Sequence, residues 1–337
     1  MSRSGDPARE TCTGLALGSG AARGLCYIGV LDALVRRQIR IDCIAGTSVG
    51  ALIGALYASG IPVSQLQRIA QNLNWRKLAR LIGPTLPTTG LLDSRKVSRF
   101  IDDLLPVKTF EALKLPLAIT ATDIESGTPI VIRNGRLLPA IQASIAFPGL
   151  FQPVLFGDRF LVDGGLCAPI PTDVARQMGA DRVIGVCAIP PVEKRYQETS
   201  VPNDSDQPER NPVSRLTVSW IEQRFREIWQ STVEHPSNEV SRRPPGIFRI
   251  FAQSVAILEN QINTMRLERD AVDVLIRPEL NGITLLEFHR AAEAIDAGRR
   301  ATFHTLDNLS IQLPIAETAR CDTMQEHGMT RKKEVKP

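Results

Sequence analysis

The chain has 337 residues, of which 43% are hydrophobic and 23% charged, a composition typical of globular proteins rather than disordered or fibrous ones. Its net charge is only +4, and no basic run alternates with aromatic residues as in a groove for single-stranded nucleic acid, so we expect no nucleic-acid partner. The length favours one α/β domain with appendages.

Six cysteines, at 12, 26, 43, 167, 187 and 321, form no CxxC pair and have no histidine at metal-ligand spacing. We therefore expect free thiols in a reducing cytosol, with no bound metal and no cofactor. The polar first twelve residues do not resemble a signal peptide, and the apolar stretch 41–61 contains Asp42 and four glycines. That stretch favours a strand and a helix over a membrane span, which predicts a cytoplasmic protein.

Short apolar strands alternate with helical patterns along the first half of the chain, which indicates a parallel sheet covered by helices. Residues 13–17 form the first predicted strand, and helices are expected at 25–38 and 49–59. Shorter helices are expected between 63 and 110. The remaining predicted strands are 43–46, 117–121, 130–133, 159–162 and 182–188. The alternation favours a doubly wound sheet over an antiparallel one.

The composition changes after this part of the chain. Proline and polar residues predominate at both ends of residues 190–246, which predicts a polar, mobile insertion there. Within it, apolar residues at helical spacing, including Trp220 and Trp229, predict an amphipathic helix over 214–233. Such a helix can act as a lid, contact a membrane peripherally, or pack on the core or on a second copy in a homo-oligomer.

The last part of the chain returns to regular patterns. A helix is expected over 247–267, a strand over 272–276 and a closing helix over 285–309. These limits predict one domain over 13–313, with a polar N-terminal tail over 1–12 and a basic C-terminal tail over 314–337.

Gly46-Thr47-Ser48-Val49-Gly50 lies between a predicted strand and a predicted helix. The two glycines in this pattern let a strand and a helix approach each other around an exposed, strained serine nucleophile. The helix N-terminus beside Ser48 favours developing negative charge. A close-packed turn without a catalytic role has the same pattern, so the motif alone leaves both interpretations open.

A second glycine-rich segment, residues 18–24 (GSGAARG), joins the first strand to the first helix. Its small side chains expose backbone N–H groups that can hold an oxyanion. The same pattern can bind a dinucleotide, which requires an acidic residue at the end of the second strand. Asp42 stands at the beginning of that strand instead, which disfavours a nucleotide-dependent oxidoreductase. Arg23 can balance the charge of an oxyanion or form a structural ion pair.

Asp163-Gly164-Gly165 directly follows a predicted strand. The two glycines allow a sharp turn that presents the carboxylate and leaves its surroundings open. Asp-Gly is also a common β-turn sequence, so this segment alone does not establish a catalytic role. Asp123 follows another predicted strand and is expected to be a turn residue.

Together, the glycine-rich loop, the serine turn and the Asp-Gly-Gly segment resemble the motifs of the patatin-like phospholipase family, in the family's order. Residues 143–148 (ASIAFP) resemble the stretch that this family carries before its last active-site strand. The resemblance covers residues 13–190 well and is strongest to the bacterial branch related to neuropathy target esterase. Ser19 and Ala21 depart from the pattern, because the family commonly has glycine at both positions.

The resemblance implies a three-layer α/β/α sandwich with a mainly parallel central sheet. It implies a serine acyl hydrolase that cleaves carboxylic esters of phospholipids or lysophospholipids through an acyl-serine intermediate. Ser48 would be the nucleophile and Asp163 its base, without a metal. The other implied roles fall to the oxyanion loop Gly18, Ser19, Gly20 and Ala21, and to the supporting residues Gly46, Gly50, Arg23, Gly164 and Gly165. A non-catalytic lipid-binding protein of the same fold stays open.

The positions of the histidines bear on whether a third catalytic residue exists. All four, at 235, 289, 304 and 327, follow Asp163 in the sequence. The first lies in a proline-rich stretch, the last in the tail, and the other two within the closing helix. None follows a predicted strand, where a triad normally carries its histidine, so we expect a two-residue catalytic centre.

Overall fold

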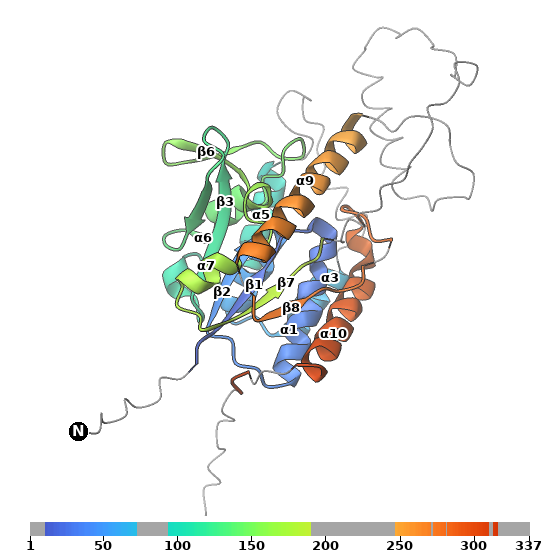
Figure 1. The fold of residues 1–337 in the computed structure, drawn as a ribbon. Helices are drawn as coiled ribbons and strands as arrows, with labels where there is room; N and C mark the ends of the chain where they lie inside the picture. The colour runs from blue at the N-terminus through green and yellow to red at the C-terminus, as the bar shows by residue number, and fades with distance from the viewer. Residues whose placement is uncertain are drawn as a thin grey trace, which may run out of the picture.

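The computed structural model describes residues 11–72, 94–189, 247–270, 272–280, 282–309 and 313–315. Within these residues an eight-stranded mixed sheet crosses the molecule, and helices cover both of its faces (Figure 1). The fold is therefore the predicted three-layer α/β/α sandwich. The predicted insertion 190–246, its helix 214–233 and most of both predicted tails lie outside the described residues.

The strands of the sheet are mainly parallel, as predicted. Hydrogen bonds link them in the order β5-β6-β3-β2-β1-β7-β8, and β4 pairs with β3. The neighbours among β1, β2, β3, β7 and β8 run parallel, while β4, β5 and β6 add antiparallel pairs. The strands are β1 (Thr13–Leu17), β2 (Cys43–Thr47), β3 (Leu117–Asp123), β4 (Pro129–Ile132), β5 (Val154–Phe156), β6 (Arg159–Asp163), β7 (Arg182–Val186) and β8 (Val274–Ile276).

The described α-helices are α1 (Cys26–Arg36), α2 (Val49–Ala58), α3 (Val63–Gln71), α5 (Ser94–Leu104), α6 (Leu137–Ser144), α7 (Thr172–Gln177), α9 (Ile247–Arg269) and α10 (Ala291–Asp307). None of these helices combines the length and hydrophobicity that a membrane span requires. Short 3-10 helices are η1 (Ala21–Leu25), η2 (Phe110–Ala112), η3 (Gly164–Leu166) and η5 (Phe288–Arg290).

The closing helix begins later than predicted, at Ala291 rather than at residue 285. The side chain of Glu287 accepts a hydrogen bond of 2.7 Å from the backbone N–H of Thr284, which holds this part of the chain in a turn. Side chain to backbone bonds of this kind compete with helix formation. The prediction of an α-helix over 285–290 was therefore wrong.

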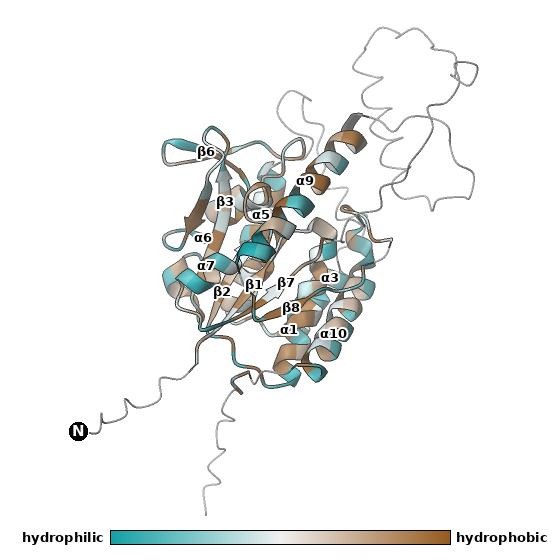
Figure 2. Cartoon of the chain, viewed as in Figure 1, coloured by the Kyte–Doolittle hydropathy of each residue, from teal (hydrophilic) through white to brown (hydrophobic). Residues whose placement is uncertain are grey.

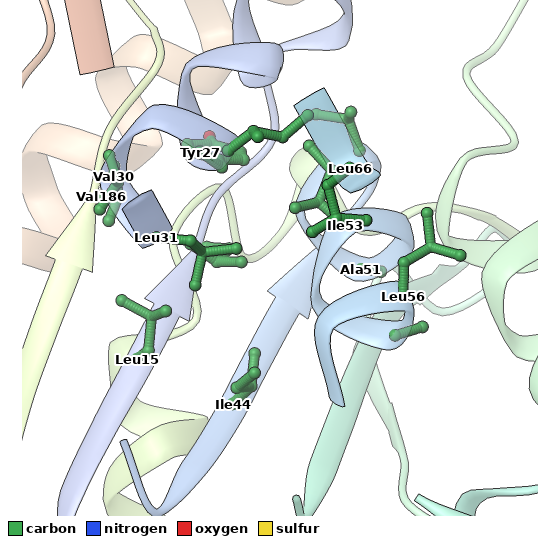
Figure 3. Packing of buried hydrophobic residues seen from close by; sticks show 14 of the residues in the cluster. Leu15, Tyr27, Val30, Leu31, Ile44, Ala51, Ile53, Leu56, Leu66 and Val186 are labelled. Carbon is green, nitrogen blue, oxygen red and sulfur yellow. The ribbon is translucent and has the colours of Figure 1, made fainter. Parts of the chain in front are cut away.

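Side chains from the two faces of the sheet enter two separate cores. Leu15 of β1 and Ile44 of β2 point toward Leu31 of α1, and α2 packs beside them (Figure 3). On the opposite face the strands carry small residues such as Ala16, which pack against Val174 of α7. Hydrophobic strands lie between helices whose outer surfaces are more hydrophilic (Figure 2). Alternation along each strand thus builds both cores.

The registers around β3 determine which strand ends meet. Thr120 pairs with Thr47 of β2 and, on its other side, with Val131 of β4. One residue later, Ala121 pairs with Asp163 of β6, while β4 continues on the other side. β6 therefore occupies the side of β3 that β2 has just left. Because β6 is antiparallel to β3, the ends of β2 and β6 point at each other.

Candidate active site

Ser48 forms the turn between β2 and α2, with φ 56° and ψ −123°. Non-glycine residues rarely adopt this conformation, which costs on the order of 1–3 kcal/mol. A Cβ at Gly46 would lie 2.6 Å from Cα of Ala51, and one at Gly50 would lie 2.5 Å from the carbonyl oxygen of Gly18. Both glycines are needed for the close approach of the turn to its neighbours.

The backbone of Ser48 is held by a second buried serine. Its N–H donates to Oγ of Ser144 at 2.8 Å, and that hydroxyl donates to the carbonyl oxygen of Thr120 at 2.7 Å. Ser144 is the last residue of α6 and is completely buried. Ser144 belongs to the stretch 143–148 of the family resemblance, but no role was predicted for it. Its contacts fix the strained backbone of Ser48 to β3.

The structure brings Ser48 and Asp163 together. Oγ of Ser48 donates to Oδ2 of Asp163 at 2.6 Å, although the residues are 115 positions apart. Oδ1 of Asp163 accepts a hydrogen bond of 2.8 Å from the N–H of Gly165. The backbone carbonyl of Asp163 accepts one of 2.9 Å from the hydroxyl of Thr122. The exposed fractions are 8% for Ser48 and 2% for Asp163. One carboxylate oxygen therefore faces the serine and the other faces η3.

Burial of Asp163 changes its strength as a base. Removal from water raises the pKa of Asp163 from 3.8 to about 6, although the hydrogen bonds from Ser48 and Gly165 act in the opposite direction. The carboxyl is then still ionised at neutral pH, yet it binds a proton more tightly than an exposed aspartate. Both properties suit a general base.

The glycine-rich loop follows β1 beside this pair. The N–H groups of Gly18 and Ser19 donate to the carbonyl oxygens of Val186 and Pro169, at 3.3 and 2.8 Å. The carbonyl of Ser19 accepts the hydroxyl of Tyr27 at 2.8 Å. These contacts fix the loop but occupy two of the four amides that the sequence analysis assigned to an oxyanion.

Gly20 and Ala21 complete the loop with positive φ angles of 152° and 49°. Within the part of the chain that the structure describes, neither N–H donates to a backbone acceptor. Of the four amides predicted to hold an oxyanion, those of Gly20 and Ala21 are therefore the two that the described backbone leaves available. The φ of Ala21 lies where glycine is favoured, which explains why its departure from the family pattern carries a conformational cost.

Arg23 lies in η1, directly after these amides. Its Nε donates to the carbonyl oxygen of Ile283 at 2.7 Å, so it ties the loop to the segment before η5. Burial lowers the pKa of Arg23, while the carboxylates of Glu259 and Glu287 oppose this shift. The hydrogen bond of Arg23 goes to a backbone carbonyl and is not the predicted ion pair; its role in balancing an oxyanion stays a prediction.

α9 brings an additional carboxyl to the site. Glu259 has an exposed fraction of 8%. A Cβ at Gly165 would overlap Oε1 of Glu259 and lie 3.1 Å from Oδ1 of Asp163. Burial and, to a smaller extent, the charge of Asp163 raise the pKa of Glu259 to about 8, while Arg23 acts in the opposite direction. Glu259 belongs to no sequence motif, so it was not among the predicted site residues.

A family model for patatin-like phospholipase matches residues 15–176. An uncharacterised NTE family protein of Mycobacterium tuberculosis is 30% identical over 344 residues, which cover 88% of this chain and 92% of the relative. The chain belongs to the patatin-like phospholipase family, within its NTE group. The matched range of this family chain includes the glycine-rich loop, Ser48 and Asp163, but not Glu259.

Two further relatives match about half of the chain, and one solved structure matches more of it at low identity. Human patatin-like phospholipase domain-containing protein 6 is 35% identical over 179 residues, which cover 51% of this chain and 13% of the human protein. Neuropathy target esterase sws of Drosophila melanogaster is 31% identical over 180 residues, 51% of this chain and 12% of that protein. The solved structure of VipD from Legionella pneumophila covers 88% of this chain and 66% of its own, with a TM-score of 0.49 and 13% identity.

Acidic residues near the other strand ends have structural contacts. Asp123 of β3 accepts the N–H of Glu125 at 3.0 Å and pairs with Arg159, as expected of a turn residue. Asp42, which the dinucleotide alternative would need beside the glycine-rich loop, accepts the N–H of Thr13 at 2.7 Å. Thr13 begins β1, so Asp42 lies at the opposite edge of the sheet from that loop.

The two described histidines belong to the C-terminal part of the domain. His289 lies in η5 and His304 in α10, whereas 235 and 327 lie outside the described residues. The hydrogen bond of the Ser48 hydroxyl goes to the carboxylate of Asp163 and not to a histidine. Across the described ranges, no group of three or more His, Cys, Asp or Glu side chains is arranged to hold a metal ion.

Proposed function

We propose that the protein is a lipid acyl hydrolase that cleaves carboxylic esters of phospholipids or lysophospholipids, with Ser48 as nucleophile and Asp163 as base. The 2.6 Å hydrogen bond from Ser48 to Asp163 carries this proposal. The strained backbone of Ser48 supports it, because such strain is typical of nucleophiles in strand-to-helix turns. Membership of the patatin-like phospholipase family supports a lipid ester as substrate.

Acylation uses both residues and the remaining loop amides. Oγ of Ser48 attacks the ester carbonyl carbon while its proton passes to Oδ2 of Asp163. The resulting oxyanion is stabilised by the N–H groups of Gly20 and Ala21 and by the positive end of α2. When the C–O bond breaks, the proton on Asp163 passes to the leaving alkoxide. The alcohol departs and the acyl group remains on Ser48.

Deacylation repeats these steps with water. Asp163 accepts a proton from a water molecule, whose oxygen attacks the acyl carbon. The same two amides stabilise the second oxyanion. Its collapse breaks the bond to Ser48, which recovers the proton from Asp163, and the fatty acid leaves. The raised pKa of Asp163 helps both steps, because a more basic carboxylate can hold the transferred proton without a histidine.

A fluorophosphonate probe followed by mass spectrometry tests the assignment, together with turnover on a panel of phospholipids and lysophospholipids. The wild-type protein should be modified on Ser48 and release fatty acid. Ser48→Ala should lose both, and Asp163→Asn should lower both rates by about 10²- to 10⁴-fold. Ser126→Ala, a change at an exposed turn serine, should retain both and serves as the control.

Two other outcomes would redirect the assignment. Lipid binding without modification of Ser48 would favour the non-catalytic lipid-binding alternative. A thermal shift with NADP but not with lipid would favour a nucleotide-dependent oxidoreductase. Unchanged ester turnover in folded Ser48→Ala would remove the proposal. The cytoplasmic location, the peripheral membrane contact through 214–233 and a homo-oligomer remain predictions that these experiments do not address.

A further inference from the structure

The inner face of α9 is polar where a packed helix is usually apolar. Glu259, Asn260 and Asn263 are buried, with exposed fractions of 8%, 7% and 3%. Ile257 and Leu258 are 43% and 60% exposed on the same helix. This reverses the ordinary amphipathic arrangement. Burying a carboxyl is costly, and such groups concentrate at functional sites, so the position of Glu259 calls for a reason.

Glu259 lies on the side of Asp163 that is turned away from the nucleophile. Oδ2 of Asp163 accepts the hydroxyl of Ser48, whereas Oδ1 accepts the N–H of Gly165. The Cα of Gly165 faces Oε1 of Glu259, so closely that a Cβ there would overlap this oxygen. Two carboxyls therefore flank one glycine, and the oxygen of Asp163 on this side is Oδ1, which Ser48 does not use.

The charged groups around Glu259 come from two elements. Asp163 of β6 raises the pKa of Glu259, and Arg23 of η1 lowers it. Tyr27 of α1 also faces Glu259, but burial raises the pKa of this phenol well above its usual value, so it stays neutral. One turn further along α9, Asn263 contacts Cys187, a thiol whose pKa burial also raises. Asp163 and Arg23 therefore set the local charge.

We propose that Glu259 is a positioning residue of the catalytic centre, whose negative charge strengthens Asp163 as the base for Ser48. This inference rests on the proposed function. In the attack, negative charge leaves Asp163 and develops on the oxyanion beside Gly20. Because Glu259 meets the aspartate turn at Gly165, on the side of Oδ1, its negative charge raises the proton affinity of the carboxylate that takes the proton of Ser48.

This arrangement predicts two steps in the dependence of rate on pH. The first rise follows ionisation of Asp163, without which no base exists. Burial places the ionisation of Glu259 at higher pH, so its charge appears in a second step. We expect that second step to raise the rate of attack by Ser48 roughly three- to tenfold.

The test measures the rate at which a fluorophosphonate modifies Ser48 from about pH 5 to about pH 10. In this reaction Oγ forms a bond to phosphorus, fluoride leaves, and the serine proton passes through Asp163 to solvent. Glu259→Gln should match the wild-type rate on the acidic side and lack the alkaline rise. Glu268→Gln makes the same change at an exposed position of α9 and should keep both steps.

An alkaline rise that persists in folded Glu259→Gln, or a constant ratio to the wild-type rate at every pH, would overturn the inference. Circular dichroism at each pH establishes folding. If the glutamine variant does not fold, Glu259→Asp decides instead, because it keeps the charge and should retain a second step of smaller amplitude. Loss of labelling in Ser48→Ala identifies the nucleophile independently, so the proposed function and this inference can fail separately.

Discussion

The turn that carries Ser48 and the turn that carries Asp163 meet beside β3, yet different contacts constrain them. A Cβ at Gly50 would overlap the carbonyl oxygen of Leu17 in β1, which is backbone. A Cβ at Gly164 would likewise overlap the carbonyl oxygen of Thr120. Gly165, in contrast, faces the end of the Glu259 side chain. The glycines of the serine turn meet backbone atoms, whereas Gly165 of the aspartate turn meets a side chain that can move.

The two turns also differ in the feature that is energetically unfavourable. Ser48 has a strained backbone conformation, with φ 56°. Asp163 has an unstrained φ of −49° but a buried carboxylate. The serine turn therefore responds to changes in backbone space, and the aspartate turn responds to changes in charge.

The largest effect is expected at the serine turn. Gly50→Ala adds a methyl group against the carbonyl oxygens of Leu17 and Gly18, neither of which can move without shifting β1. We expect the free energy of unfolding to fall by at least about 3 kcal/mol, with loss of Ser48 labelling. Urea denaturation measures the first quantity and fluorophosphonate modification the second.

Gly54→Ala is the matched control on the same helix. Its added methyl would lie 3.1 Å from Cγ2 of Ile44, a side chain that can adjust. Alanine is favoured over glycine in a helix by about 1 kcal/mol, so we expect stability to change by no more than that. Equal stability of the Gly50 and Gly54 variants would show that the serine turn is not rigid.

The second effect tests the cost of charge at the aspartate turn. The folded pKa of Asp163 lies above its unfolded value of 3.8, so its contribution to stability is complete below pH 3.8 and is lost as pH rises through about 6. Asp163→Asn removes this loss. The free energy of unfolding of the variant should therefore exceed that of the wild type by about 1–3 kcal/mol at neutral pH, and the difference should vanish near pH 4.

Thermal and urea unfolding at both pH values measure this difference. Ser48→Ala removes the hydrogen bond that lowers the pKa of Asp163, so it should cost more stability at neutral pH than near pH 4, the opposite direction to Asp163→Asn. If Asp163→Asn were less stable than the wild type at neutral pH, the hydrogen bonds of the carboxylate would outweigh its burial, and the contrast between the two turns would fail.

The parts of the fold that the sequence predicted are those with strong local patterns. β1 and α2 agree with the predictions at nearly every residue, because apolar runs and glycine breaks mark their ends. β5, α6 and α7 were missed. β5 has three residues and α7 has six, too few for a period to emerge. α6 has eight residues and begins directly after Arg136, which forms an isolated bridge with Thr109.

The candidate site was predictable to the same degree. Ser48 and Asp163 each stand at a strand end with glycines beside them, and the structure places them in hydrogen-bonding contact. The occupied amide of Ser19 was not predictable, because its acceptor is Pro169, about 150 residues away in a loop without a motif. Glu259 escaped notice for a similar reason, since only the packing of α9 buries it.

The smallest effect is expected at the movable side of the aspartate turn. In Gly165→Ala the new methyl would meet Oε1 of Glu259, which can swing away at a cost of about 1 kcal/mol. The displaced carboxyl should then act less strongly on Asp163, so the alkaline rise in Ser48 labelling should shrink while the acidic step stays.

A double-mutant cycle with Glu259→Ala isolates this contact. Alanine at 259 removes the overlap with Oε1, the shortest contact of the new methyl, so Gly165→Ala should cost less in that background than in the wild type. Urea denaturation of the four proteins gives the coupling free energy. An equal cost in both backgrounds would mean that Oδ1 of Asp163 and Cβ of Ser19, not Glu259, resist the methyl. The aspartate turn would then be as rigid as the serine turn, and Glu259 would have to act on Asp163 by charge without being pressed against its turn.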